Sequence, residues 1–220
     1  MSGCKRQSRW EESFEQCTGW GNGVLPPRYP ETTMTPTTPQ RRVAVYCGSA
    51  FGSNPAFLAE ARALGAAIAA AHLGLVYGGA SVGLMGAVAD AALDGGAEVI
   101  GVLTQALAEL EIAHPALTTL ELVPTMHQRK ARMVHLADAF LILPGGYGTL
   151  EEMLEAVTWA QLGLHAKPVI LIDTAHYWDT FLQFLDSVVQ AGFLQPKNRN
   201  LLQLAANAQQ AVAMAAHPNP

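Results

Sequence analysis

Short apolar runs alternate with longer, helix-patterned stretches from Arg41 to the end of the chain. The runs predict buried strands at about 43–47, 73–77, 98–103, 119–123, 139–143 and 168–172. The stretches between and after them predict helices at about 55–71, 125–137, 150–162, 178–190 and 205–216, and one from the glycine turn at 78–86 to Gly95, with 104–115 irregular. Unbroken apolar strands separated by helices pair in parallel, with helices over both faces. We therefore expect an α/β fold, a doubly wound parallel sheet in a single domain.

Residues 1–40 do not share this pattern. The run at 31–39 is rich in threonine and proline and shows no apolar periodicity, so it has no face to bury. We predict a disordered tail over 1–40 and one folded domain over 41–220. Met34 is one candidate for the biological start of the protein, and an ordinary flexible extension is the alternative.

The composition limits the kind of protein. Half of the 220 residues are hydrophobic and 14% are charged, which suits a compact fold with a full core. The net charge of −5 argues against a nucleic-acid binder, which usually carries a basic face. The three cysteines form no CxxC pair, which favours a reduced, cytoplasmic protein. No apolar stretch is long enough to span a membrane.

One stretch, 139–152, combines a strand, a glycine turn and the start of a helix. Its apolar run ends at Pro144, and three glycines then let the backbone approach a ligand closely. Thr149 is a good helix N-cap, and Glu152 follows three residues later, as a capping box requires. The first N–H groups of such a helix bind anions, so the stretch predicts a phosphate site at the carboxyl end of a strand. A tight turn with a well-capped helix is the plainer alternative.

A basic segment at 126–132 opens the preceding helix. Arg129 and Lys130 fall in its first turns, where an arginine fork can hold a phosphate; a solvated basic face is the alternative. Glu151 and Glu152 would repel a bare phosphate, but they suit a sugar phosphate because carboxylates accept hydrogen bonds from ribose hydroxyls. One of them can stabilise an oxocarbenium-like carbon or activate water there, so cleavage of a glycosidic bond fits this group.

Signatures of other sites are missing. The first turn, 47–53, lacks the GxGxxG spacing of a nicotinamide-binding unit, and the chain has no GxxxxGK[ST] segment. The histidines show no HExxH or paired spacing, so a metal site is weakly supported. Gly78 and Gly79 serve close packing or a ligand equally well. A pyridoxal phosphate enzyme needs a Schiff-base lysine, and none of the lysines is well placed for that role: Lys5, Lys130, Lys167 and Lys197.

Together these motifs resemble the LONELY GUY (LOG) family. The segment PGGYGTLEE at 144–152 matches the family signature P-G-G-x-G-T-x-x-E. The likeness extends to VYCGS, LVYGG, VGLMG, MHQRK and TWAQLG, at 45–49, 75–79, 82–86, 126–130 and 158–163. It covers about 42–195, nearly all of the expected domain. Members of the family are cytokinin riboside 5′-monophosphate phosphoribohydrolases, long mislabelled as lysine decarboxylases.

The resemblance implies a Rossmann-like fold, usually a homodimer, that hydrolyses the N-glycosidic bond of N6-modified adenosine 5′-monophosphates to free base and ribose 5-phosphate. It implies that Arg129 and Glu152 form the catalytic pair and that no metal or organic cofactor takes part. The implied substrate contacts are Ser49, Gly79, Glu111, Lys130, Gly145, Gly146, Tyr147, Gly148, Thr149, Leu150, Glu151 and Thr158. The chain departs from the family pattern at Ala80, where a third glycine is common, and at Thr104, where proline is common.

A carrier protein is the alternative function. Molybdenum-cofactor carriers have glycine turns of this kind on a similar scaffold, and such a protein would bind a nucleotide or cofactor without turnover. The pairing of Arg129 with Glu152 favours the enzyme. The sequence leaves open whether the preferred purine carries a prenyl group or is plain adenine.

Overall fold

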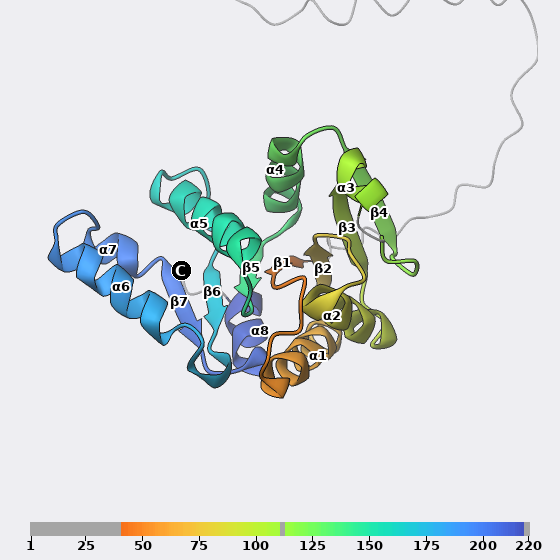
Figure 1. Ribbon diagram of the computed structural model, residues 1–220, viewed down its shortest axis with the longest axis horizontal. Helices are drawn as coiled ribbons and strands as arrows, with labels where there is room; N and C mark the ends of the chain where they lie inside the picture. Colours follow the sequence, from red (N-terminus) through yellow and green to blue (C-terminus); the bar gives the residue numbers. More distant parts are fainter. Residues whose placement is uncertain (1–40, 111–112, 218–220) are drawn as a thin grey trace, which may run out of the picture. The chain divides into compact units, whose positions relative to one another are not determined.

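The computed structural model describes residues 41–110 and 113–217. In this part of the chain, seven strands form one sheet in which every neighbouring pair is parallel (Figure 1). The strands are β1 (Arg42–Tyr46), β2 (Gly74–Tyr77), β3 (Val99–Thr104), β4 (Thr119–Val123), β5 (Ala139–Ile142), β6 (Val169–Ile172) and β7 (Leu202–Ala205). Their order across the sheet is β4-β3-β2-β1-β5-β6-β7.

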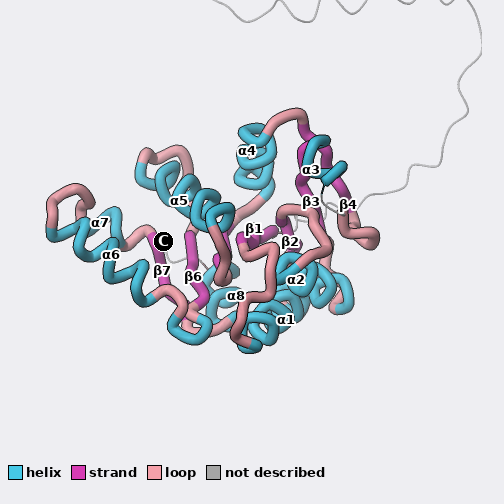
Figure 2. The backbone as a smooth tube through the Cα atoms, in the orientation of Figure 1, coloured by secondary structure: helices cyan, strands magenta, loops and turns pink. Residues whose placement is uncertain are grey.

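Helices connect the strands and cover the sheet on both faces. They are α1 (Pro55–Ala70), α2 (Gly83–Asp94), α3 (Gln105–Leu110), α4 (Met126–Leu136), α5 (Tyr147–Gln161), α6 (Asp179–Gln190), α7 (Pro196–Arg199) and α8 (Ala208–Ala216), with a short 3-10 turn, η1 (Thr174–His176). Figure 2 shows the strands between two sets of helices, α1, α2 and α8 on one side and α4 and α5 on the other. The expected doubly wound, Rossmann-like α/β fold is therefore confirmed.

Alternation along the central strands produces the two cores. Val43 and Val45 of β1 point to the layer of α1, α2 and α8, whereas Ala44 and Tyr46 point to the layer of α4, α5 and α6. All four side chains are buried, because a central parallel strand has helices over both of its faces. This explains why the strands of this sequence read as unbroken apolar runs.

The strand order reverses between β1 and β5. From β1 the chain proceeds outward to β4 on one side, and it then crosses over to β5 and proceeds outward to β7 on the other. The loops after β1 and β5 therefore diverge at this switch point, where doubly wound sheets bind their ligands. The backbone N–H of Gly48 donates to the carbonyl oxygen of Pro144 at 3.0 Å, which joins the two loops.

Three expectations about the fold are wrong. The helix expected from Ala205 begins at Ala208, where Asn207 caps it, and the residues before it form the edge strand β7. Its polar Gln203 interrupts the apolar run that would signal a strand. The segment expected to be irregular contains α3, and α7 was not expected at all. The tail over 1–40 and Met34 lie outside the described residues, so the domain division stays a prediction.

Candidate active site

Helix α4 brings two buried cations to the carboxyl edge of the sheet. Thr125 caps the helix by accepting a hydrogen bond from the backbone N–H of Gln128 at 3.2 Å, which starts the first turn at Met126. Arg129 and Lys130 are only 8% and 6% exposed. Buried charges must be paired, so the alternative of a solvated basic face does not describe these two side chains.

Arg129 is held by contacts with the sheet and with α5. Its Nε donates to the carbonyl oxygen of Val102 in β3 at 2.8 Å. Its Nη1 donates to Oε1 of Glu152 at 2.8 Å, which forms an ion pair between α4 and α5. The guanidinium also lies against Gly78, where a Cβ atom would come within 2.6 Å of Nη2. Glycine at 78 therefore makes room for this arginine after β2.

Glu152 is a largely buried carboxylate. Its side chain is 15% exposed, and burial raises its pKa while the ion pair with Arg129 opposes that shift. The net direction is upward because the loss of hydration outweighs the arginine. A carboxyl group with a raised pKa exchanges protons more readily near neutral pH, which is the property required of a general acid or base.

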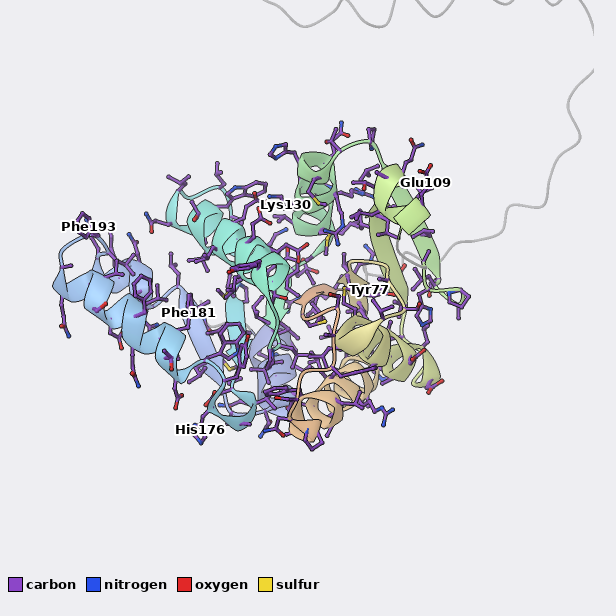
Figure 3. All side chains as sticks on the ribbon, viewed as in Figure 1. Tyr77, Glu109, Lys130, His176, Phe181 and Phe193 are labelled. Carbon is purple, nitrogen blue, oxygen red and sulfur yellow. The ribbon has the colours of Figure 1, made fainter. Side chains whose placement is uncertain are left out.

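Lys130 points the other way, toward α5. Its Nζ donates to Glu151 and, at 2.7 Å, to Oε2 of Glu155. Burial works against the charged form, but the two carboxylates outweigh it, so the pKa of Lys130 is raised. Figure 3 labels Lys130 between α4 and α5. The expected phosphate contact of Lys130 stays a prediction; in this structure its ammonium group is paired with two carboxylates.

The glycine turn starts α5 earlier than expected. Helix α5 begins at Tyr147 with Gly146 as its N-cap, so the expectation that Thr149 caps the helix is wrong. Thr149 is buried inside the first turn, and its side chain lies against Gly145. The expected capping box is also wrong, because Glu152 is directed to Arg129 instead. The first N–H groups of α5 still lack acceptors within the helix, so the expected anion site at its start stands as a prediction.

Replacing Gly145 with alanine is expected to lower both stability and activity. An added Cβ would lie 2.7 Å from Cβ of Thr149 and 2.8 Å from the backbone nitrogen of Gly48, so both loops would have to shift. Overpacking of this kind costs about 1–3 kcal/mol. Displacing the turn should also lower kcat/KM by about 10²-fold. Thermal unfolding of Gly148→Ala is the matched control, because a Cβ at 148 meets nothing within 4 Å. Equal melting temperatures for the two variants would contradict the prediction.

Most of the remaining expected contacts fall into two places. Ser49 and the glycine turn border a cavity of about 280 Å³ that is lined by the loops after β1 and β5, by Phe57 and by Tyr177. The outer face of α5 forms an open depression of about 750 Å³ lined by Tyr147, Leu150, Glu151, Leu154, Glu155, Thr158 and Trp159. Gly79 has φ +83° and packs on Leu103, so backbone conformation alone requires glycine there. Glu111 lies outside the described residues.

Tyr177 contacts the glycine turn, and the sequence motifs did not indicate this residue. Its hydroxyl donates to the carbonyl oxygen of Gly145 at 2.6 Å. The residue lies in the loop after β6, and strand-end loops of a parallel sheet share one edge. The sequence signal for this contact was an aromatic residue that follows shortly after an apolar strand.

Within the described residues, one group of side chains has metal-ligand spacing. Ligand atoms of Asp173, His176 and Asp179 all lie within 4.8 Å of one another. Nδ1 of His176 is 3.7 Å from Asp173 and 3.4 Å from Asp179, and the histidine is mostly exposed. Exposed acidic groups of this kind are common without a metal ion, and the absence of a catalytic metal stays a prediction.

The glycine turn and the pair of Arg129 and Glu152 lie at the carboxyl edge of the sheet, where doubly wound sheets bind their ligands, and the fold places the protein in the Rossmann-like α/β class. The family model described as "Possible lysine decarboxylase" matches residues 85–215. The cytokinin riboside 5′-monophosphate phosphoribohydrolase LOG7 of Arabidopsis thaliana is 46% identical over 78% of this chain and 79% of its own length. The cytokinin riboside 5′-monophosphate phosphoribohydrolase LOG of Oryza sativa subsp. japonica is 46% identical over 78% of this chain and 71% of its own length. The chain belongs to the LOG family, as its motifs suggested.

Solved structures show the same fold at lower identity. The molybdenum cofactor binding protein of Rippkaea orientalis superposes with a TM-score of 0.60 at 21% identity, over 80% of this chain and 96% of that one. The molybdenum cofactor carrier protein of Chlamydomonas reinhardtii superposes with a TM-score of 0.59 at 22% identity, over 79% of this chain and 94% of that one. Likeness at this level concerns the fold alone. No helix in the described residues combines the length and apolar character needed to cross a membrane.

Proposed function

We propose that the protein hydrolyses the N-glycosidic bond of adenosine 5′-monophosphates, with N6-modified purines included, and releases the free base and ribose 5-phosphate. Relatives that are 46% identical carry this activity in their names. The observation that supports the proposal most directly is the ion pair of Arg129 with the largely buried Glu152, next to the start of α5. A carboxylate beside an anion site suits a sugar phosphate, because the sugar hydroxyls can donate to the carboxylate while the phosphate occupies the anion site.

The chemistry is a substitution at the anomeric carbon. The C1′–N9 bond breaks with its electron pair going to the purine, and the oxygen of a water molecule forms the new bond to C1′. Glu152 stabilises the positive charge that develops on the ribose and accepts a proton from that water, which then passes to the purine. Arg129 holds the carboxylate of Glu152 in place at 2.8 Å, and the N–H groups at the start of α5 hold the 5′-phosphate.

The label of lysine decarboxylase does not fit the described residues. Such an enzyme requires a lysine that can form a Schiff base with pyridoxal phosphate. Lys130 is buried against two carboxylates, and Lys167 donates to the carbonyl oxygen of Val134 at 2.7 Å. Lys167 and Lys197 both precede strands, so they lie at the edge opposite the glycine turn. A carrier role draws support only from fold likeness, whereas the pair of Arg129 and Glu152 favours hydrolysis.

Chromatography of reaction products tests the proposal. Purified protein is incubated with isopentenyladenosine 5′-monophosphate, with AMP, and with isopentenyladenosine that lacks the phosphate. We expect free base from at least one of the two monophosphates and much less from the unphosphorylated riboside. A nucleotide complex that persists for days without free base would contradict hydrolysis and support the carrier.

We also propose that the protein is a cytoplasmic homodimer. Its ligand is a small nucleotide, and it does not bind nucleic acid. The family resemblance implies the dimer, and exposed apolar side chains on α5, on α6 and after each helix support it: Leu154, Leu162, Phe184 and Phe193. Light scattering of the full chain is expected to give the mass of two chains. The mass of a single chain throughout the micromolar range would contradict the dimer. The net charge of −5 supports the absence of nucleic acid.

A further inference from the structure

Tyr177 reaches the glycine turn from a distant part of the chain. Its hydroxyl donates to the carbonyl oxygen of Gly145 at 2.6 Å, across a sequence separation of 32 residues. Its ring lies edge-on to two other aromatic rings, with centroids 5.7 Å from Phe57 of α1 and 4.9 Å from Trp178. The hydroxyl is therefore held at the turn by aromatic packing and not only by its own hydrogen bond.

The segment that carries Tyr177 is firmly anchored. Trp178 is 1% exposed, and its indole N–H donates to the carbonyl oxygen of Ile172 at 3.2 Å. Its ring also packs edge-on against Phe181, which Figure 3 labels. Ala175 and His176 have φ of 53° and 58°, so the chain reverses sharply after β6 and returns Tyr177 toward β5. Such anchoring fixes where the hydroxyl can donate.

The hydrogen bond sets the orientation of one peptide unit. The peptide between Gly145 and Gly146 is trans, so its C=O and N–H point in opposite directions. Because the carbonyl oxygen is drawn to Tyr177, the N–H of Gly146 is directed to the other side of the turn. Gly146 is the N-cap of α5, and in the described part of the chain its N–H has no hydrogen-bond acceptor. Two adjacent glycines would otherwise leave this peptide free to rotate.

We propose that Tyr177 is a positioning residue that holds the Gly145–Gly146 peptide so that the N–H of Gly146 faces the 5′-phosphate. This rests on the proposed function insofar as the anion is the phosphate of a sugar phosphate. Tyr177 does not touch the reacting atoms. It acts through one backbone amide, so it strengthens phosphate binding and does not change the rate of the chemical step.

The test uses Tyr177→Phe, which removes the hydroxyl and keeps the ring. We expect KM for the monophosphate and Ki for ribose 5-phosphate to rise about fivefold to tenfold, with kcat changed less than twofold. In ¹⁵N-labelled wild-type protein, ribose 5-phosphate should shift the amide signal of Gly146, and the variant should lose most of that shift. Tyr77→Phe is the matched control, because the buried hydroxyl of Tyr77 has no partner among the described residues. It should leave KM, Ki and the Gly146 signal unchanged.

Two outcomes would overturn the inference. One is a Tyr177→Phe protein with wild-type Ki for ribose 5-phosphate and a wild-type Gly146 response. The other is a wild-type protein that binds ribose 5-phosphate without any response of the Gly146 amide. Failure of hydrolysis is a separate result, because a protein whose Gly146 amide responds as expected but which cleaves no monophosphate contradicts only the proposed function. All titrations are made well below the melting temperature of each variant, so a change in stability does not enter them.

Discussion

Glu152→Gln is expected to lower kcat for monophosphate hydrolysis by about 10³-fold while the protein stays folded. Glutamine keeps an oxygen that can accept from Arg129, but it has no ionised form and cannot accept a proton from water. The loss should appear in kcat, because the carboxylate acts on charge that develops only in the transition state. Product chromatography under saturating substrate measures the rate, and thermal unfolding measures the fold.

The control for Glu152→Gln is Glu121→Gln. Glu121 also pairs with an arginine of α4, since Arg132 donates to it at 2.6 Å and 2.9 Å, but this pair is more exposed. The control should keep its rate, and it should lose little stability because exposed ion pairs contribute about 0–1 kcal/mol. Full activity in a folded Glu152→Gln protein would contradict the catalytic role. An equal loss in both variants would point to a general effect of removing a carboxylate that pairs with an arginine of α4.

The dependence of the rate on pH supplies an independent check of Glu152. Burial raises its pKa above the usual range, so the ionised form that accepts the proton is lost at a higher pH than for an exposed glutamate. The acid limb of the wild-type pH profile of kcat/KM, which reports groups of the free enzyme, should therefore lie above about 4.3, the ordinary pKa of glutamate. The same shift means that protonated Glu152 favours the folded state, and that this contribution to stability disappears as the pH rises through the folded-state pKa.

The sheet could be predicted from the sequence because burial on both faces produces apolar runs, which a local pattern displays. The start of α5 at Tyr147, inside the glycine signature, could not be predicted in this way. The spacing of Thr149 and Glu152 satisfies a capping box, yet the contact that directs Glu152 crosses 23 residues to Arg129 and leaves no trace in a local pattern. The strand β7 was not predicted for another reason. At the edge of the sheet its side chains are only partly buried, so the strand does not form an unbroken apolar run.

The adjacent cations of α4 show what sequence alone leaves undecided. Neighbouring residues on a helix point about 100° apart, so a basic pair can meet two different partners. Arg129 is directed to the sheet and to Glu152, whereas Lys130 is directed to Glu151 and Glu155. The resemblance to the LOG family separated their roles, and the structure supplies the physical difference. The arginine joins a backbone carbonyl and a carboxylate at the sheet edge, while the lysine joins two helices.

Arg129→Lys is expected to lower kcat/KM by about 10²-fold to 10³-fold, although the charge is conserved. A single ammonium group cannot span the carbonyl oxygen of Val102 and Oε1 of Glu152, which Nε and Nη1 of the arginine reach at 2.8 Å each. One buried partner is then left unsatisfied, which should cost about 1–3 kcal/mol of folding free energy. Steady-state kinetics and thermal unfolding measure the two effects.

The matched control is Arg132→Lys, one turn further along α4. Arg132 also uses two nitrogens, both directed to Glu121, but its side chain is 38% exposed and water can replace a lost contact. Its substitution should change kcat/KM less than about twofold and stability by less than about 1 kcal/mol. If Arg129→Lys kept wild-type kcat/KM, the shape of the guanidinium would not matter and its role would be that of a charge alone. Because the fork holds both the sheet edge and the carboxylate of Glu152, we expect the two substitutions to differ by at least about 50-fold in activity.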